Sequence, residues 1–149
     1  MNGAIIGFCY GLRIVEGEAI KIEQLTLTGN SGDAMVVIDS RDVNIEDARV
    51  FVPAGPPSTD IHIQKNQLYY NEDGIFLVGV QDSRIVNNHA YLNRSVGIAL
   101  IEGSVGNKIL HNTASGNGAW DMGHTPDSTP NQWLGNTCST SEGIDVDCP

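Results

Sequence analysis

Residues Ile61 to Leu77 read IHIQKNQLYYNEDGIFL, and this stretch alternates short apolar runs with turns that contain asparagine. Within each run, apolar side chains recur at every second position, which is the period of a β-strand with one buried face. Asparagine tolerates the left-handed backbone conformation that a sharp turn requires. The stretch therefore predicts short strands at 61–63, 67–69 and 74–77, joined by turns at Asn66 and at Asn71 to Asp73.

The same pattern recurs downstream at a period in the low twenties. Four asparagines, spaced 22, 24 and 24 residues apart, each follow an apolar residue by three positions, and they are Asn66, Asn88, Asn112 and Asn136. A period of this length fits one turn of a solenoid and is too long for a single helix or strand. We therefore expect parallel strands stacked about 4.8 Å apart, with these asparagines forming a structural ladder rather than binding ligands.

The repeat extends towards the N-terminus through Ile22 and Ile45, which occupy the position of Ile63 in earlier coils. The step from Ile45 to Ile63 is only 18 residues and contains Pro53-Ala54-Gly55-Pro56-Pro57. Because proline cannot donate to a strand ladder, we expect a loop over 53–60. The chain, 1–149, then forms one all-β domain of about six coils with three short strands per coil, and 131–149 forms the closing coil and tail.

The chain is acidic, with 18 Asp and Glu against 8 Lys and Arg and a formal net charge of -10. This balance argues against nucleic acid as a partner, because phosphate binding needs a basic surface, and it disfavours anionic membranes. No apolar run reaches the roughly 18 residues of a membrane-spanning helix. The apolar start, Met1 to Tyr10, lacks the features of a signal peptide, so we expect a coil strand and a chain truncated at its N-terminus.

Two of the three cysteines, Cys138 and Cys148, are near enough in sequence to close a small C-terminal loop. A disulfide between them would suit an oxidising compartment, whereas two free thiols would suit a reducing cytosol. The third, Cys9, lies in an apolar run and is expected to be a small buried side chain.

A pattern of the type I-x-x-N-x-x-x-x-N followed by G-I-x-L is carried by Ile63 to Leu77 and, with one added turn residue, by Ile85 to Leu100. It resembles the right-handed parallel β-helix repeats of the pectate-lyase-like superfamily. The closest likeness is to the copper-binding NosD-like and mannuronan-epimerase-like repeat proteins. The resemblance implies right-handed coils and activities ranging from polysaccharide lyases, hydrolases and epimerases to proteins without known catalysis. The tail from Asn131 to Cys138, with Cys148, resembles the closing coil of secreted β-helix proteins and implies an extracellular or cell-surface location.

The catalytic motifs of the resembling enzymes, an Asp-Pro-His-Glu sequence and a closely spaced Asp-Asp pair, are absent.

Outward positions on the first strand of each coil form a column that is basic in an otherwise acidic chain. The column contains Lys21, Asn44, His62, Arg84, Lys108 and Gln132. It would hold the carboxylates of an acidic polysaccharide, and the alternative is ordinary solvated strand decoration.

The second strand of each coil predicts two further outward files, one polar and one aromatic. The polar file contains Gln67, His89 and Thr113, and the aromatic file contains Phe51, Tyr69 and Tyr91. Aromatic rings in register would give a flat platform for sugar rings, although such ladders also stabilise parallel stacks without a ligand. If this face is catalytic, His89 is the expected general base, because histidine titrates near neutral pH.

The third strand has apolar outward positions, at Val36, Ile38, Phe76, Val78, Ala99 and Ile101. Monomeric proteins rarely expose a contiguous apolar patch of this kind. We therefore interpret this face as a subunit interface of a homo-oligomer, with cover by the proline loop or by the C-terminal tail as the alternative.

One polar cluster is a candidate for metal binding or catalysis, namely Asp121 and His124 for acid–base chemistry and Asp121 and Asp127 for an ion. Their spacing matches no metal signature, and a polar loop is the plain alternative. No cofactor is expected, and calcium is the ion left open.

The leading hypothesis is a secreted or surface domain that recognises, and in one version processes, an acidic polysaccharide. The rival hypotheses are a structural, oligomeric solenoid without substrate and a metal-dependent polysaccharide lyase.

Overall fold

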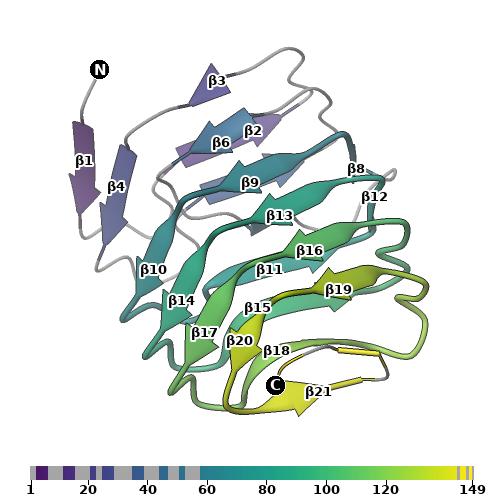
Figure 1. Cartoon of the computed structure of the whole chain (residues 1–149). Coiled ribbons are helices and arrows are strands. Elements are labelled where there is room, and N and C mark those ends of the chain that lie inside the picture. Colours follow the sequence, from purple (N-terminus) through teal and green to yellow (C-terminus); the bar gives the residue numbers. More distant parts are fainter. Residues whose placement is uncertain are drawn as a thin grey trace.

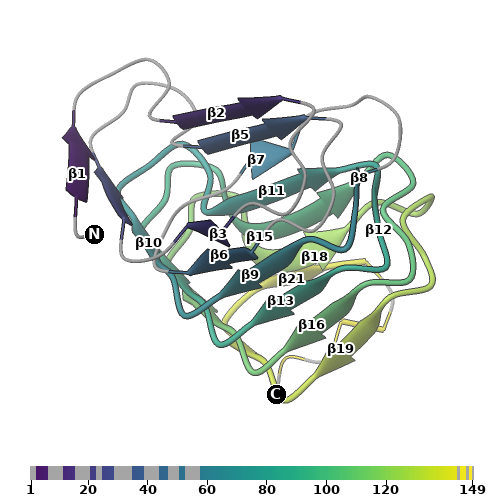
Figure 2. The ribbon, with the colours of Figure 1, turned by 90° about the horizontal axis from the view of Figure 1, so that it is seen from above.

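Three parallel β-sheets enclose one apolar core in the computed structural model (Figure 1). The structure describes residues 58–143, 145, 146 and 148, and before them the strand backbones at 3–6, 12–15, 21–22, 25–28, 35–38, 44–46 and 51–52. The chain passes from sheet to sheet and returns to the first one coil further along, as the view from above shows (Figure 2). The predicted all-β parallel solenoid is therefore confirmed.

Each sheet collects one strand from successive coils, and all strand pairs within it are parallel. Sheet I has six strands, β3 (Lys21–Ile22), β6 (Asn44–Glu46), β9 (His62–Gln64), β13 (Arg84–Val86), β16 (Lys108–Leu110) and β19 (Gln132–Leu134). Sheet II has four, β10 (Gln67–Tyr69), β14 (His89–Tyr91), β17 (Thr113–Ser115) and β20 (Thr137–Cys138). Sheet III has seven, β2 (Leu12–Val15), β5 (Met35–Ile38), β7 (Phe51–Val52), β11 (Ile75–Val78), β15 (Val96–Ile101), β18 (Trp120–His124) and β21 (Ser141–Glu142).

Two small sheets of two strands complete the described secondary structure. They pair β1 (Gly3–Ile6) with β4 (Leu25–Thr28), and β8 (Ser58–Thr59) with β12 (Val80–Gln81). The second pair forms part of the return from sheet III to sheet I. Among the described residues, no helix is long and apolar enough to cross a lipid bilayer.

The register follows the repeat that the sequence predicts. Ile85 pairs with Ile63 on one side and Ile109 on the other, and the next pair joins Ile109 to Trp133. Within residues 58–143, three coils are regular, formed by β9 to β11, β13 to β15 and β16 to β18, and this count differs from the about six coils predicted for the chain. The closing coil is shorter, since β20 and β21 have two residues each. The predicted loop at 53–60 falls partly on residues 53–57, outside the described part, and its end forms β8.

The core consists of the inward side chains of the three sheets, stacked in files along the solenoid axis. Sheet I contributes Ile63, Ile85, Ile109 and Trp133; sheet II contributes Leu68, Ala90 and Ala114; sheet III contributes Ile75, Leu77, Ile98, Leu100 and Met122. Alternate residues point outward because successive side chains of a strand face opposite ways. The outward residues of sheets I and II are consequently the exposed groups from which a site is built.

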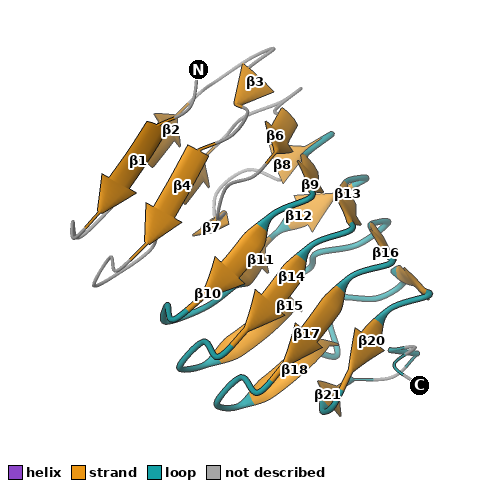
Figure 3. Cartoon of the chain, turned by 60° about the vertical axis from the view of Figure 1, so that its left-hand side comes forward, coloured by secondary structure: helices purple, strands orange, loops and turns teal. Residues whose placement is uncertain are grey.

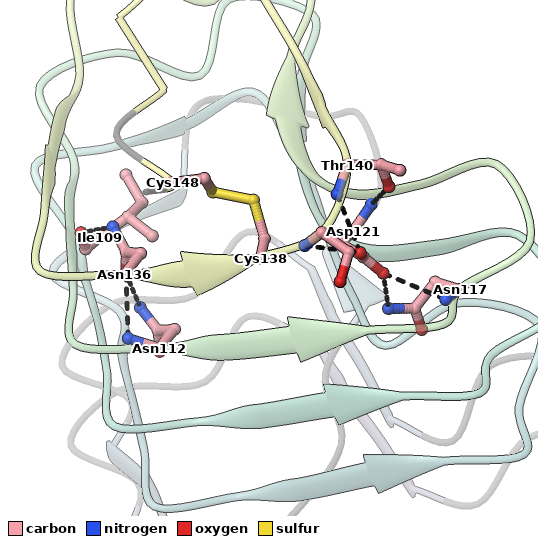
Figure 4. The surroundings of a disulfide bond; sticks show 9 residues. Ile109, Asn112, Asn117, Asp121, Asn136, Cys138, Thr140 and Cys148 are labelled. Atoms are coloured by element: carbon pink, nitrogen blue, oxygen red, sulfur yellow. Dashed lines mark hydrogen bonds between the residues drawn. A yellow bond between two sulfur atoms is a disulfide. The ribbon is translucent and has the colours of Figure 1, made fainter.

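The predicted asparagine ladder is confirmed, and it is buried. Asn66, Asn88, Asn112 and Asn136 are each at most 1 % exposed. Asn88 shows the arrangement: its side-chain Nδ2 donates to Asn112 Oδ1 at 3.0 Å and to the backbone oxygen of Ile63 at 3.0 Å. Figure 4 shows the equivalent bonds between Asn112 and Asn136. These amides satisfy the backbone groups that each turn would otherwise leave buried and unpaired.

Candidate functional site

The basic column of sheet I is present and exposed. Arg84 pairs with His62 on one side and with Lys108 on the other, and Lys108 pairs with Gln132. All four side chains are exposed. The strand backbones continue the column through Asn44 to Lys21. Like charges directly opposite each other on neighbouring strands destabilise a sheet, so fold stability does not account for placing Lys108 beside Arg84.

Sheet II, whose strands β10, β14, β17 and β20 are seen side by side in Figure 3, carries the predicted polar file and part of the aromatic file. His89 pairs with Gln67 and with Thr113, and Tyr91 pairs with Tyr69. Gln67 and His89 are exposed, and both tyrosines are half-buried. The two tyrosine rings are stacked, with centroids 5.0 Å apart and planes 11° from parallel.

Two details of the aromatic file differ from the prediction. Phe51 does not belong to it, because β7 lies in sheet III, where Phe51 pairs with Phe76 and Val36. The sequence misplaced Phe51 because the regular repeat puts a sheet II strand after each sheet I strand, whereas the next described strand after β6 is β7 of sheet III. The tyrosines also form no flat platform, since stacked rings one coil apart must turn their faces towards each other along the axis. The faces that Tyr69 and Tyr91 turn towards each other are therefore closed to a sugar ring.

From β9 onward, sheets I and II together form a surface that lacks acidic residues, whereas the preceding strand of sheet I, β6, ends in Glu46. Neither Asp nor Glu occurs in the segments 62–70, 84–92, 108–116 and 132–140, which supply the strands and the corner between the two sheets. We call the outward side of these segments the acid-free surface. Its basic and imidazole groups, all exposed, are His62, Lys65, Arg84, His89, Lys108 and His111. In a chain of net charge -10, this segregation concentrates positive charge on one side of the solenoid.

Lys65 and His111 lie at the corner between the two sheets and were missed by the strand-by-strand analysis. Both have left-handed backbones, with φ of 57° and 54°. The signal that would have found them is the absence of acidic residues over whole segments, which the sequence alone displays.

The predicted cluster of Asp121, His124 and Asp127 does not form. Asp121 and His124 are three strand positions apart on β18, so their side chains point to opposite faces. Asp127 is exposed in the turn that follows and accepts a hydrogen bond from Thr125 Oγ1. Among the described residues, no group of three or more His, Cys, Asp or Glu side chains is placed to hold a metal ion.

Asp121 instead ends the second asparagine ladder, which runs from Asn71 through Asn93 to Asn117. Its Oδ1 accepts from the backbone N and the Nδ2 of Asn117, at 3.0 and 2.7 Å, as an asparagine of the next coil would. Its Oδ2 accepts from the backbone N–H groups of Ser139 and Thr140, at 3.0 and 3.1 Å (Figure 4). Both oxygens therefore accept hydrogen bonds from N–H donors, which gives Asp121 a structural role.

These contacts also set the charge of Asp121, which is 1 % exposed. Burial by itself raises the pKa of the carboxyl group, and the hydrogen bonds from Asn117, Ser139 and Thr140 outweigh it. The net effect lowers the pKa below its ordinary value, so Asp121 is a buried carboxylate that four N–H groups hold in its charged form.

His124 occupies a core position rather than a catalytic one. It pairs with Leu100, is 3 % exposed, and its ring lies 6.2 Å from that of Trp133. Its Nδ1 is 2.9 Å from the backbone oxygen of Thr125, to which it can donate. A histidine closed off in this way cannot reach a polymeric substrate, so the prediction of His124 as a catalytic residue is wrong. His89, in contrast, is exposed.

The outward face of sheet III is apolar, as predicted, but it is not an open patch in its described part. Val78 and Ala99 are 6 % and 0 % exposed within the single chain, and Phe76 and Ile101 are half-buried. Val36 and Ile38 have described backbones only, so their side chains lie outside the described residues. The expectation of exposed apolar side chains is wrong for Val78 and Ala99. A homo-oligomer through this face stays a prediction.

The C-terminal disulfide is confirmed. Cys138 and Cys148 are bonded, with their Cα atoms 5.2 Å apart (Figure 4). Cys148 and Val146 pack against the lower end of the core, so the bond fastens the tail beneath the last coil. Cys9 lies outside the described residues.

Fold and repeat together define the class: a right-handed parallel β-helix whose coils are held by asparagine ladders. Residues 2–144 match one known protein family, NosD, whose description is "Periplasmic copper-binding protein (NosD)". The chain belongs to this family. Neither the comparison with curated proteins nor the comparison with solved structures gave a match.

The family's description raises the question of a copper site. Copper favours imidazole, thiolate and thioether ligands. In the described part of the chain, both cysteines form the disulfide, Met122 is fully buried in the core, and His124 faces Trp133. The remaining histidines lie on different strands or turns, at His62, His89 and His111. The described residues therefore do not fit a copper centre.

Proposed function

We propose that this chain is an extracytoplasmic β-helix module that binds an acidic polysaccharide across the acid-free surface. The observation that carries the proposal is the exposed row of His62, Arg84 and Lys108 on segments that contain no Asp or Glu. The location is supported by the disulfide, which is typical of oxidising compartments, and by the description of the NosD family as periplasmic.

The row suits a polymer that carries one carboxylate on each sugar. Strands of neighbouring coils are about 4.8 Å apart, so the row offers one basic or imidazole side chain per coil to carboxylates spaced along a polymer. Arg84 can bind a carboxylate with two parallel hydrogen bonds, and Lys108 acts as a point charge. Gln67, Thr113 and the hydroxyl groups of the stacked tyrosines supply hydrogen bonds for sugar hydroxyls.

The proposed activity is binding rather than hydrolysis. Most glycoside hydrolases use two carboxyl groups that flank the scissile bond, and the acid-free surface contains none. His89 is the one predicted catalytic residue that lies on this surface, where it is available as a hydrogen-bonding partner or as a base.

The proposal is tested by binding of acidic glycans to the double variant Arg84→Gln/Lys108→Gln. Charge-assisted hydrogen bonds contribute about 1.5–3 kcal/mol each, so we expect the affinity to fall roughly 100-fold or more, and wild-type binding to weaken as salt increases. Calorimetric titration of an oligogalacturonate gives both results.

Glu72→Gln/Arg94→Gln is the matched control. Arg94 is also exposed, but it lies outside the acid-free surface and pairs with Glu72 at 3.8 Å, so the double change leaves no unpaired charge behind. It should leave the affinity unchanged. Equal affinities for the wild type and the double variant would refute the proposed site. Absence of glycan binding to the wild-type chain would favour the structural solenoid instead.

A further inference from the structure

The corners of the solenoid contain residues with left-handed backbones, and one corner has an unusual composition. At the corner before sheet I these residues are Asp60, Asp82 and Gly106, and between sheets I and II they are Lys65, Asn87, His111 and Gly135. Such positions favour glycine and short polar residues. At the corner after sheet II the chain instead has Tyr70 and Leu92, with φ of 57° and 54°, and then Gly116.

Neither Tyr70 nor Leu92 is explained by folding stability. Tyr70 is 67 % exposed and Leu92 is 47 % exposed, and with Leu134 they are the exposed large hydrophobic residues of the described part of the chain. A left-handed backbone costs a bulky residue free energy, and side chains this exposed recover little of it through burial. Strained, exposed apolar residues of this kind cluster at ligand-binding sites.

Tyr70 is the ring that is most open to a ligand. Tyr69 and Tyr91 are half-buried and each closes one face of the other, whereas the Tyr70 ring is 67 % exposed, lies 5.7 Å from that of Tyr69 and is turned by 75°. In an edge-to-face pair at least one face of Tyr70 stays uncovered by Tyr69, whichever ring supplies the edge. Leu92 extends this apolar area over Gly116, where an added Cβ would lie 3.3 Å from its Cδ2.

The surroundings select the kind of ligand. Tyr70 and Leu92 directly follow Tyr69 and Tyr91, which belong to the acid-free surface. On the same strands, Gln67 and His89 lie two residues earlier. Glu72, which lies beyond the corner, is paired with Arg94. A cluster of four side chains is too small for a stable protein interface, which buries about 800 Å² on each partner. It matches the apolar face of a single sugar ring, beside positive charge that complements an acidic glycan.

We infer that Tyr70 and Leu92 form a subsite on which one pyranose ring of the bound polysaccharide stacks. This inference rests on the proposed function and deepens it, because it places a sugar ring at a corner that the charged column does not reach. One part of the glycan therefore lies along the charged row of sheet I, and a later sugar of the same polymer crosses sheet II to stack at the corner beyond it.

The test compares three variants in titrations with an oligogalacturonate long enough to span both sheets. Tyr70→Asn removes the ring while keeping a residue that tolerates a left-handed backbone, and it should weaken binding at least 10-fold. Tyr70→Phe keeps the ring face and should bind within about 2-fold of the wild type. Arg84→Gln/Lys108→Gln reports on the charged column in the same experiment. Thermal unfolding confirms that each variant is folded.

The outcomes separate the two proposals. If Tyr70→Asn binds as the wild type does while the charge variant is weakened, the subsite is wrong and the proposed function stands. A Tyr70→Phe variant as weak as Tyr70→Asn would show that the hydroxyl group, not the ring face, makes the contact, and would overturn the stacking. If the wild-type chain binds no acidic glycan, both proposals fail.

Discussion

Asp121 shows how a residue that looks catalytic in sequence can be structural. The closing coil has Ser139 and Thr140 rather than an asparagine in the turn before β21, and Asp121 supplies the missing acceptor from the same coil as Asn117. The equivalent residues of the preceding coils are Gly74 and Gly97, where an added Cβ would lie 2.2 Å from a backbone oxygen of the next coil. Only the last regular coil therefore has room for an acidic side chain at this position.

This role predicts that Asp121→Asn destabilises the protein. An amide offers only one oxygen, so two of the four N–H donors would face an NH₂ group. We expect a loss of about 2–3 kcal/mol in the free energy of unfolding, measured by chemical denaturation at pH 7. Thr113→Ala, a half-buried change on sheet II, is the control. A variant as stable as the wild type would contradict the ladder role.

The lowered pKa of Asp121 adds a pH dependence with a definite sign. The carboxylate stabilises the fold above its unfolded pKa, about 3.9, and this contribution is lost as the pH falls through the lower folded pKa. Wild-type stability should therefore fall below about pH 4 more steeply than that of Asp121→Asn. Parallel pH profiles for the two proteins would contradict this account.

At the scale of the strand and turn, the sequence predicted regular features well and irregular ones poorly. The period of Asn66, Asn88 and Asn112 was enough to predict register, burial alternation and the ladder, because each coil repeats the same contacts. A further ladder through Ser83, Asn107 and Asn131 was missed, since its members differ in type. Phe51 was assigned to sheet II rather than sheet III because its coil is irregular.

The candidate site was predictable only as columns of exposed residues. Sequence placed Arg84 beside Lys108 and Tyr69 beside Tyr91 correctly. It could not reveal the ring orientations or the left-handed backbone of Tyr70, which depend on three-dimensional packing. It also could not show that His124 points into the core.

The ladder makes a prediction of its own. Asn112→Ala would remove the acceptor of the Asn88 backbone N–H and the donor to Ile85 oxygen, at 2.9 and 2.8 Å, and leave both buried. We expect a loss of roughly 2–5 kcal/mol, measured by denaturant unfolding. The exposed neighbour Asn87, changed to glycine to keep its left-handed backbone, should behave as the wild type does. Similar stabilities for the two variants would argue against the ladder as a stabilising element.

The whole molecule has a lower end that is closed by its tail. β19, β20 and β21 are the last strands of their sheets, and Val146 and Cys148 pack under the core there. Reduction of the Cys138–Cys148 bond should release this segment, because it restores freedom to a loop with a sequence separation of 10. We expect the free energy of unfolding to fall by about 2–3 kcal/mol and Tm by roughly 5–10 °C.

The measurement is calorimetry with and without a phosphine reductant. Cys138→Ser/Cys148→Ser should match the reduced wild type and show no further change on reduction. An unchanged Tm after complete reduction would mean that packing of the tail does not depend on the disulfide.

The central claim is that an acidic polysaccharide binds the acid-free surface, and one experiment locates such binding directly. The isotope-labelled chain is titrated with an oligogalacturonate and followed by amide chemical shifts. The account predicts saturable shifts confined to residues 62–70, 84–92 and 108–116 and to the neighbouring corners. Saturable shifts centred on sheet III, or no shifts at all at millimolar glycan, would contradict it.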